Sequence, residues 1–131
     1  MAISKDEIGP SSYVYVCAEE LNLEDLEKEL LSKRIRYQRI FIDELPISSK
    51  REDREAFVHL MRSLTSGDKL YVPSLGSLGP ILRDVLHSIW HFKNSGVSLY
   101  CMQMTPVDLT SSAAREIIST LSCALEICCD E

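Results

Sequence analysis

The chain of 131 residues lacks any apolar stretch close to the roughly 20 residues that a membrane-spanning helix requires. Its polar start, Met-Ala-Ile-Ser-Lys-Asp-Glu, lacks the apolar segment of a secretory signal. Its five cysteines are an odd number and lack the spacing of a small disulfide framework. These absences predict a cytoplasmic protein with reduced thiols and no membrane contact.

A positive charge balance is also lacking, since 20 Asp and Glu residues outnumber 14 Lys and Arg residues and give a net charge of −6. Modules that grip nucleic acid by themselves are usually basic, so the composition argues against DNA binding by this chain alone. What is present is 45% hydrophobic and 26% charged residues, a balance typical of a globular domain with its own core.

Strand-like and helix-like segments alternate along the chain after a loose leader at residues 1–11. Runs of β-branched and aromatic residues predict strands at 12–17, 37–43, 69–73 and 97–102. Capping residues and apolar faces predict helices that begin at Asn22, Asp53, Pro80 and Leu109, the last one reaching Cys128. This alternation predicts an α/β domain over residues 12–131, with a mostly parallel sheet of four or five strands and helices on both faces.

The first strand ends on a nucleophile-type side chain, Cys17. In parallel α/β sheets, ligands and reacting groups gather at the carboxyl ends of the strands. Cys17 is therefore the main candidate for a catalytic residue. A reactive thiolate needs a neighbouring cation, however, and Glu19 and Glu20 follow instead. The interpretation left open beside catalysis is a buried structural cysteine.

Two further clusters have simple explanations beside functional ones. The most basic patch follows the first expected helix and contains Lys33, Arg34, Arg36 and Arg39. It is either a solvated helix end or a contact for an acidic partner or nucleic acid. His87 and His91 share a helix face with Asp84, but no fourth ligand is evident and the His-Glu-x-x-His pattern is absent. The sequence therefore predicts no metal and no cofactor.

Five short blocks follow one another at characteristic spacing. They are Tyr13-Val14-Tyr15-Val16-Cys17, Ile40-Phe41-Ile42-Asp43, a serine-rich loop with Asp53-Arg54, Gly67-Asp68 and Leu121-Ser122-Cys123-Ala124-Leu125. In this order they resemble the N-terminal catalytic domain of the serine site-specific recombinases, the resolvases and DNA invertases, over about residues 12–128. The resemblance implies a resolvase-like α/β fold, DNA strand cleavage through a serine–phosphate link, and a homodimer formed largely through the last helix.

The same resemblance places the family's nucleophile at Cys17 and one phosphate-binding arginine at Arg54. The other arginines are missing, because Tyr15 stands for one and the family's Leu-Asp-Arg-Leu-Gly-Arg reads Leu-Gly-Ser-Leu-Gly-Pro at residues 75–80. A Glu-Arg pair near the end of the last helix is matched by Cys128 and Cys129. Each lost charge donor costs on the order of 10²–10³ in rate, so we expect little or no recombination.

Arg54 itself has two interpretations, a remnant of the phosphate site or a surface residue paired with Asp53 or Glu55. The family's helix-turn-helix DNA-binding domain has no counterpart before Glu131, so sequence-specific DNA reading is not expected of this chain. The apolar circumference of the last helix, with Ile118 and Leu125 as anchors, favours self-association.

The sequence thus predicts a recombinase-like domain with a degenerate site that works as a non-catalytic protein-interaction or regulatory module related to DNA recombination. Two alternatives stay open. One is an active site-specific recombinase that uses Cys17 as its nucleophile, and the other is a sensor of a phosphorylated ligand near Arg54.

Overall fold

The computed structural model of the chain describes residues 11–104 and 107–129, with side chains given as far as Ala124. Its centre is a sheet of four parallel strands in the order β2-β1-β3-β4. The strands are β1 (Ser12–Cys17), β2 (Arg39–Asp43), β3 (Lys69–Val72) and β4 (Ser98–Cys101). The predicted parallel α/β fold is therefore confirmed, with each strand within two residues of its expected bounds.

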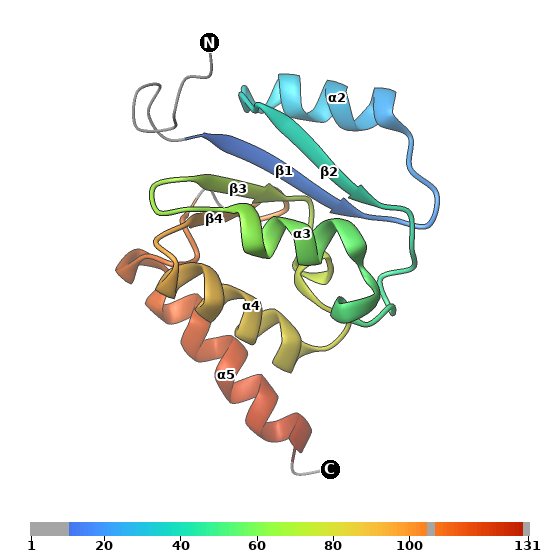
Figure 1. Cartoon of the computed structure of the whole chain (residues 1–131). Helices are drawn as coiled ribbons and strands as arrows, with labels where there is room; N and C mark the ends of the chain where they lie inside the picture. Colours follow the sequence, from blue (N-terminus) through green and yellow to red (C-terminus); the bar gives the residue numbers. More distant parts are fainter. Residues whose placement is uncertain (1–10, 105–106, 130–131) are drawn as a thin grey trace.

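Helices cover both faces of this sheet, as Figure 1 shows. One face carries α2, and the other carries α3 and α4, with α5 running beside α4. The bounds are α2 (Leu23–Ser32), α3 (Glu55–Ser63), α4 (Leu82–Asn94) and α5 (Arg115–Cys129), with short 3-10 turns at Arg51–Asp53, Leu75–Leu78 and Ser112–Ala114. Within the described residues, no helix is both long enough and apolar enough to span a membrane.

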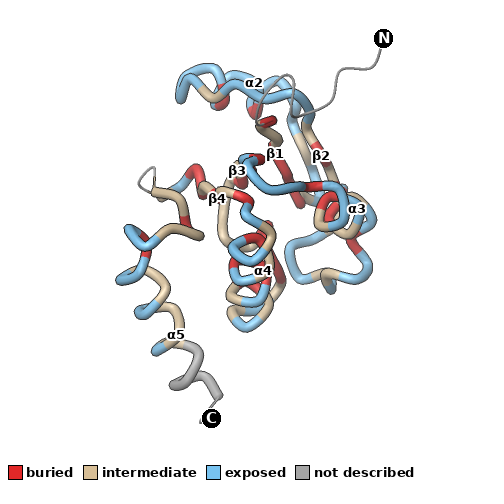
Figure 2. The backbone as a smooth tube through the Cα atoms, turned by 60° about the vertical axis from the view of Figure 1, so that its left-hand side comes forward, coloured by how far each residue is buried: buried red, intermediate tan, exposed pale blue. Residues whose placement is uncertain are grey.

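The core has two layers because successive side chains of β1 point to opposite faces of the sheet. Val14 and Val16 pack with Leu26 and Leu30 of α2. Tyr15 belongs to the larger cluster under α3 and α4, together with the side chains of Cys17, Phe41, Phe57 and Phe92. Figure 2 shows the buried residues concentrated in the strands, whereas the outer side of α2 is exposed. β1 is consequently covered on both faces, which explains its nearly continuous apolar sequence.

Only one of the expected helix starts is correct. Asn22 caps α2, and its side-chain oxygen accepts a hydrogen bond of 3.2 Å from the backbone N–H of Asp25. The expected start at Asp53 is wrong, because Asp53 ends a 3-10 turn and α3 begins at Glu55. The carboxylate that accepts hydrogen bonds from the start of this helix belongs to Asp43 at the end of β2, well outside the residues that normally cap a helix.

The starts expected at Pro80 and Leu109 are also wrong. Residues 75–78 form a 3-10 turn, and α4 begins only at Leu82. The backbone N–H of Leu109 donates a hydrogen bond of 2.7 Å to Leu99, so the chain there still follows β4 and α5 begins at Arg115. At the other end, Ser11 is buried and bonded to Asp68 and Lys69, so it belongs to the fold and not to the leader. Residues 1–10 of the expected leader lie outside the described residues.

The described part of α5 is less apolar on its outer side than the sequence predicted. Ile117 and Ile118 are half-buried and pack against the large core cluster. The exposed positions of this segment are mostly polar and comprise Arg115, Glu116, Ser119, Thr120 and Cys123. The side chain of Leu125, the second predicted anchor, lies outside the described residues.

Candidate functional site

Cys17 lies at the carboxyl end of β1, where the sequence placed it, but its side chain is only 4% exposed. The thiol donates a weak hydrogen bond of 3.4 Å to the backbone oxygen of Leu45. Burial raises the pKa of the Cys17 thiol, and the positive charge of Arg54 opposes this rise. A buried thiol with a raised pKa is a poor nucleophile, because the thiolate is the attacking species.

Tyr15 stands where the resemblance expects an arginine, and it makes a different kind of contact. Its hydroxyl is fully buried and donates a hydrogen bond of 2.7 Å to Oδ2 of Asp43. Burial and the neighbouring carboxylate raise the pKa of Tyr15 far above its usual range, so the phenol stays neutral. This position therefore supplies no cation beside Cys17.

Asp43 is the centre of this buried polar group. Besides the Tyr15 hydroxyl, its carboxylate accepts hydrogen bonds from the backbone N–H groups of Ala56 at 2.9 Å and Phe57 at 3.0 Å. These N–H groups belong to the first turn of α3, where the helix dipole favours a negative charge. Asp43 thus joins β1, β2 and α3, and it brings a carboxylate close to Cys17.

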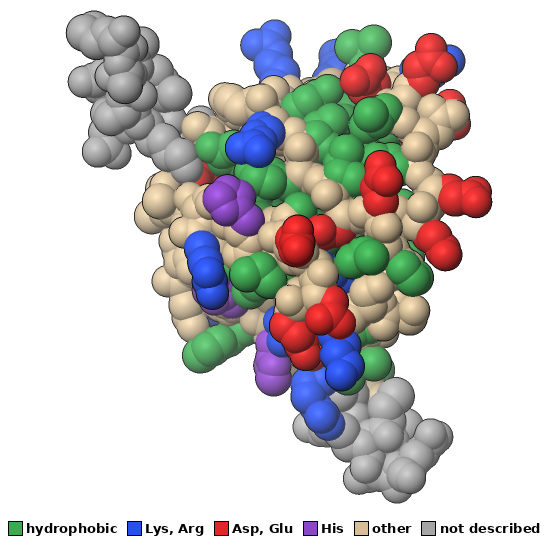
Figure 3. Space-filling model, turned by 45° about the vertical axis from the view of Figure 1, so that its right-hand side comes forward, with side chains coloured by type: hydrophobic (Ala, Val, Ile, Leu, Met, Phe, Trp, Pro, Cys, Tyr) green, Lys and Arg blue, Asp and Glu red, His purple; other side chains and the backbone are tan. Residues whose placement is uncertain are grey.

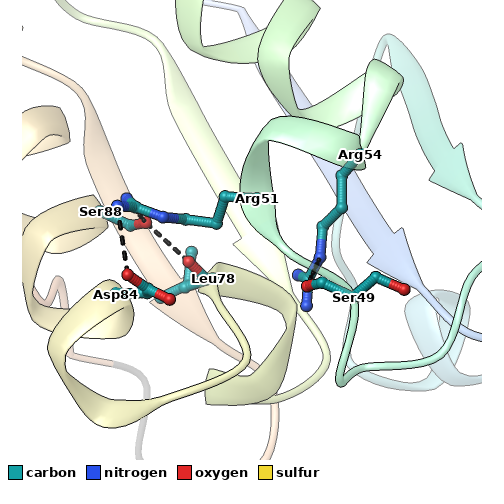
Figure 4. A network of polar contacts seen from close by, with 6 residues as sticks. All are labelled: Ser49, Arg51, Arg54, Leu78, Asp84 and Ser88. Carbon is teal, nitrogen blue, oxygen red and sulfur yellow. Dashed lines mark hydrogen bonds and ion pairs between the residues drawn. The ribbon is translucent and has the colours of Figure 1, made fainter.

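Arg54 is completely buried, so the interpretation as a surface ion-pair residue is wrong. Its guanidinium donates to four backbone oxygens at 2.6–3.2 Å, those of Ile47, Ser49, Gly76 and Ser77. Figure 4 shows the side chain directed at Ser49. Arg54 therefore fastens the serine-rich loop to the turn at residues 75–78, and its donors point at protein carbonyls.

A second arginine, Arg51, fastens the same region to α4, and the sequence analysis did not identify it. Its guanidinium donates to Oγ of Ser88 at 3.0 Å and forms an ion pair of 3.4 Å with Asp84. Ser88 in turn donates a hydrogen bond of 2.6 Å to the backbone oxygen of Leu78 (Figure 4). The spacing of Asp84 and Ser88, four residues apart on one helix face, was the available signal. Nothing in the loop sequence identified Arg51 as their partner.

The turn at residues 75–80 leaves little room for a side chain at either of its glycines. A Cβ atom added at Gly76 would lie 2.8 Å from Cγ2 of Ile47. One added at Gly79 would collide with the side chain of Asp84. The resemblance expects glycine at position 79 as well, but an aspartate at position 76. Because real Cβ atoms do not approach other atoms so closely, an aspartate at Gly76 would require the Ile47 side chain to shift.

The two histidines singled out from the sequence lie on α4 beside Arg51. His87 and His91 line a groove of about 600 Å³ with Arg51, Met61 and Trp90. No group of three or more potential metal-ligating residues occurs in the described part of the chain.

The residues of the predicted basic patch do not lie together. Lys33 and Arg34 line a separate groove, whereas the guanidinium of Arg39 lies 4.6 Å from the ring centre of Phe41. On the face drawn in Figure 3, acidic side chains lie along the right and at the lower centre, whereas Lys and Arg side chains lie at the top, on the left and below, and His side chains lie on the left and below.

Comparisons with known proteins agree with this fold. The family model described as the resolvase N-terminal domain matches residues 18–127. The transposon Tn2501 resolvase of Escherichia coli is 27% identical over 117 residues, and the serine recombinase PinR of Escherichia coli strain K12 is 24% identical over 117 residues. Each alignment covers 88% of this chain, which spans about 60% of the length of these curated relatives.

A solved structure extends the likeness to three dimensions. The N-terminal catalytic domain of TP901-1 integrase superimposes with a TM-score of 0.66 at 17% identity, over 88% of this chain and 94% of that chain. At this identity the likeness concerns the fold, which has the strand and helix arrangement described above. Since the family model covers most of the chain, the protein belongs to the resolvase N-terminal domain family of serine recombinases.

Proposed function

We propose that this domain does not cleave DNA and acts instead as a protein-interaction or regulatory module related to DNA recombination. The observation that carries the proposal is the state of Arg54, whose guanidinium is fully buried and bonded to four backbone oxygens. A cation held in this way supports the fold, and it is not directed at an incoming phosphate.

The chemistry of strand cleavage explains why this state matters. Attack on a phosphodiester develops negative charge, and preorganised cations beside the phosphorus stabilise that charge. Here the nucleophile position is a buried thiol, and the nearest acid–base pair is formed by neutral Tyr15 and Asp43. Arg54 is occupied by backbone oxygens, Arg51 is paired with Asp84 and Ser88, and the turn at 75–80 is uncharged, which supports the absence of a phosphate cradle among the described residues.

The direct test is a search for a covalent protein–DNA adduct. The purified chain is incubated with fragmented genomic DNA of its source organism, so that no target site has to be guessed, and adducts are resolved under denaturing conditions. The transposon Tn2501 resolvase with its own site serves as the positive control for the assay. We expect no adduct, and an adduct that disappears in Cys17→Ala would overturn the proposal.

One observation favours the alternative, an active recombinase with Cys17 as its nucleophile. The charge of Arg54 acts to lower the pKa of Cys17, so the two positions remain electrostatically linked. The variant Cys17→Ser distinguishes the non-catalytic module from the active recombinase, because it restores the hydroxyl nucleophile of the family but none of the missing cations. The non-catalytic proposal expects Cys17→Ser to remain inactive, and strand cleavage by this variant would favour the alternative.

The proposed module forms a homodimer through α5 and works in the cytoplasm with its cysteines reduced. Half-buried apolar residues along the described part of α5 support the dimer and comprise Ile117, Ile118, Leu121 and Ala124. Free thiols at Cys17, Cys101 and Cys123 support a reducing environment. Sequence-specific binding of duplex DNA, where it occurs, is then made by a partner and not by this chain alone.

A further inference from the structure

A groove of about 460 Å³ lies on the α2 side of the sheet, away from Cys17 and Arg54. We call it the tyrosine groove, because Tyr71 of β3 and Tyr100 of β4 line it together with Lys33, Arg34 and Ile35, the residues that follow α2. Met102 contributes to the wall after β4 ends. The volume lies in the range of small-molecule sites, and no acidic residue occurs among the described residues that line it.

The two tyrosines form an aromatic stack in this groove. Tyr71 and Tyr100 are paired across neighbouring strands, and their rings stack at 5.1 Å between centroids with an angle of 19° between planes. Both side chains are only half-buried, so part of each ring remains accessible. Each ring covers one face of the other, so a planar ring of a ligand extends the stack on an outer face, and aromatic faces bind bases without requiring a particular sequence of donors and acceptors.

Two cations stand beside this aromatic surface. The ammonium of Lys33 donates a hydrogen bond of 3.0 Å to the backbone oxygen of Met102, which fixes its position and leaves further N–H groups for a ligand. The side chain of Arg34 is exposed and makes no hydrogen bond or ion pair to any described residue. Together they offer an ammonium group with three donors and a fork-shaped guanidinium group, and both kinds of group bind phosphate.

The backbone of Arg34 gives an independent reason to assign it a role. Its φ angle is 57°, in the left-handed region, and the N–H of Ile35 reaches back to the oxygen of Leu30 at 2.9 Å. This is the Schellman end of a helix, at a position that glycine usually occupies because other residues are strained there. An arginine at such a position, beside a groove with a second cation, points to use of its side chain.

The surrounding charges do not oppose an anion in the groove. Burial raises the pKa of both tyrosines, so they stay neutral and can donate hydrogen bonds. The carboxylate that acts on Tyr100 belongs to Asp108, and it already accepts hydrogen bonds from the N–H of Leu99 and from Thr110. Its charge is thereby largely satisfied within the protein.

We propose that the tyrosine groove binds a nucleotide, with the base stacked on an outer face of the Tyr71–Tyr100 pair and the phosphate between Lys33 and Arg34. The same chemistry is offered by a free nucleotide and by the phosphorylated end of a single strand. The proposal concerns a different surface from Cys17 and Arg54, so it does not depend on the absence of catalysis there.

The test is a nuclear magnetic resonance titration of the isotope-labelled full chain with adenosine monophosphate, adenosine and inorganic phosphate. We expect the monophosphate to shift the backbone resonances of Arg34, Tyr71 and Tyr100 and to bind at least about tenfold more tightly than either part alone, because both halves of the groove then contribute. A 5′-phosphorylated trinucleotide distinguishes the sources. Binding of the monophosphate alone indicates a free nucleotide, and binding of both ligands indicates that a strand end is also accepted.

Variants test separately the phosphate-binding half and the base-binding half of the groove. Arg34→Gly should weaken the monophosphate about tenfold and leave adenosine unchanged, and it relieves backbone strain, so loss of folding does not confuse the result. Tyr100→Leu should weaken adenosine and the monophosphate together. Arg36→Ala is the matched control, because it removes one charge from the same segment outside the groove. Absence of shifts in the groove, equal binding of phosphate alone, or unchanged affinity in Arg34→Gly would each overturn the proposal.

Discussion

The Tyr15 hydroxyl and the Asp43 carboxylate form a buried hydrogen bond of 2.7 Å that joins the central strand to its neighbour β2. Asp43 lies opposite Cys17 in the strand register, so this pair stands directly beside the candidate catalytic residue. A neutral phenol and a carboxylate that accepts hydrogen bonds from the start of α3 occupy this position, and neither of them is a cation. The pair therefore belongs to the architecture of the domain, and its contribution can be measured as stability.

Removal of this hydroxyl should destabilise the fold. Tyr15→Phe keeps the ring and deletes one donor to a buried carboxylate, so we expect the free energy of unfolding to fall by about 1–3 kcal/mol. Urea denaturation followed by circular dichroism measures the change. Tyr37→Phe, at an exposed position, is the control and should change stability by less than about 0.5 kcal/mol. Equal values for the two variants would show that the Tyr15–Asp43 bond contributes nothing.

Arg54 should be required for folding rather than for ligand binding. Arg54→Ala leaves four backbone oxygens without their donor and is expected to cost about 3–5 kcal/mol of stability. Arg54→Lys should recover only part of this loss, because an ammonium cannot reproduce the guanidinium fork. Thermal unfolding measures both variants, with Arg62→Ala on the exposed side of α3 as control.

The same experiment examines the phosphorylated-ligand alternative for Arg54. If the guanidinium serves only the fold, inorganic phosphate and phosphorylated compounds should raise the melting temperature of wild type and of Arg54→Lys equally. A stabilisation that is specific to wild type would indicate a phosphate site at Arg54 and would contradict the structural role.

The Cys17 thiol should be unreactive in the folded protein. Because its side chain is 4% exposed, we expect a thiol reagent at neutral pH to modify exposed Cys123 rapidly and Cys17 only on unfolding. Mass spectrometry of digested samples identifies the modified residue. Modification of Cys17 at the rate of Cys123 would show that the site is open in solution.

The raised pKa of Cys17 also predicts a pH dependence. The unfolded thiol ionises near pH 8.5, whereas burial delays ionisation in the folded protein. The neutral thiol therefore makes its full contribution to the free energy of unfolding below about pH 8.5. This contribution is lost as the pH rises toward the pKa of the folded protein. The free energy of unfolding of wild type should decline relative to Cys17→Ala over this alkaline range. Parallel curves for the two proteins would contradict the assignment.

Replacement of Arg34 by glycine should stabilise the domain. Glycine adopts the left-handed conformation without strain, so Arg34→Gly is expected to raise the free energy of unfolding by about 1 kcal/mol. Arg36→Gly, two residues later in the connection to β2, controls for the added chain flexibility and should not stabilise. Destabilisation by Arg34→Gly would mean that the arginine side chain contributes to the fold itself.

Self-association should depend on the last helix. Sedimentation velocity is expected to show a dimer at micromolar concentration, and Leu125→Glu should weaken it by about tenfold or more, since a charge would enter an apolar contact. Thr120→Glu adds the same charge at an exposed position of α5 and should leave the dimer intact. A monomer across the whole concentration range would rule out the dimer.

The sequence alone determined the architecture and the resemblance. Alternating strand and helix patterns are local properties, and the period of side chains along β1 already required cover on both faces of the sheet. The position of Cys17 at the end of a strand could likewise be read from the order of residues. Helix starts were less predictable. The first N–H groups of α3 donate to Asp43 of strand β2, and the residue directly before that helix makes no side-chain capping bond.

Only the tertiary structure decided what the site residues do. By sequence Arg54 was either a surface residue or a remnant of the phosphate site, and its internal role did not emerge, because its four oxygens come from two loops that folding brings together. Arg51 and Ser88 are 37 positions apart, so their contact has no local signature. The tyrosine groove likewise combines residues after α2 with strands β3 and β4. Such contacts depend on the packing of distant segments, since burial and hydrogen-bond partners are set by the surroundings and not by neighbours in the chain.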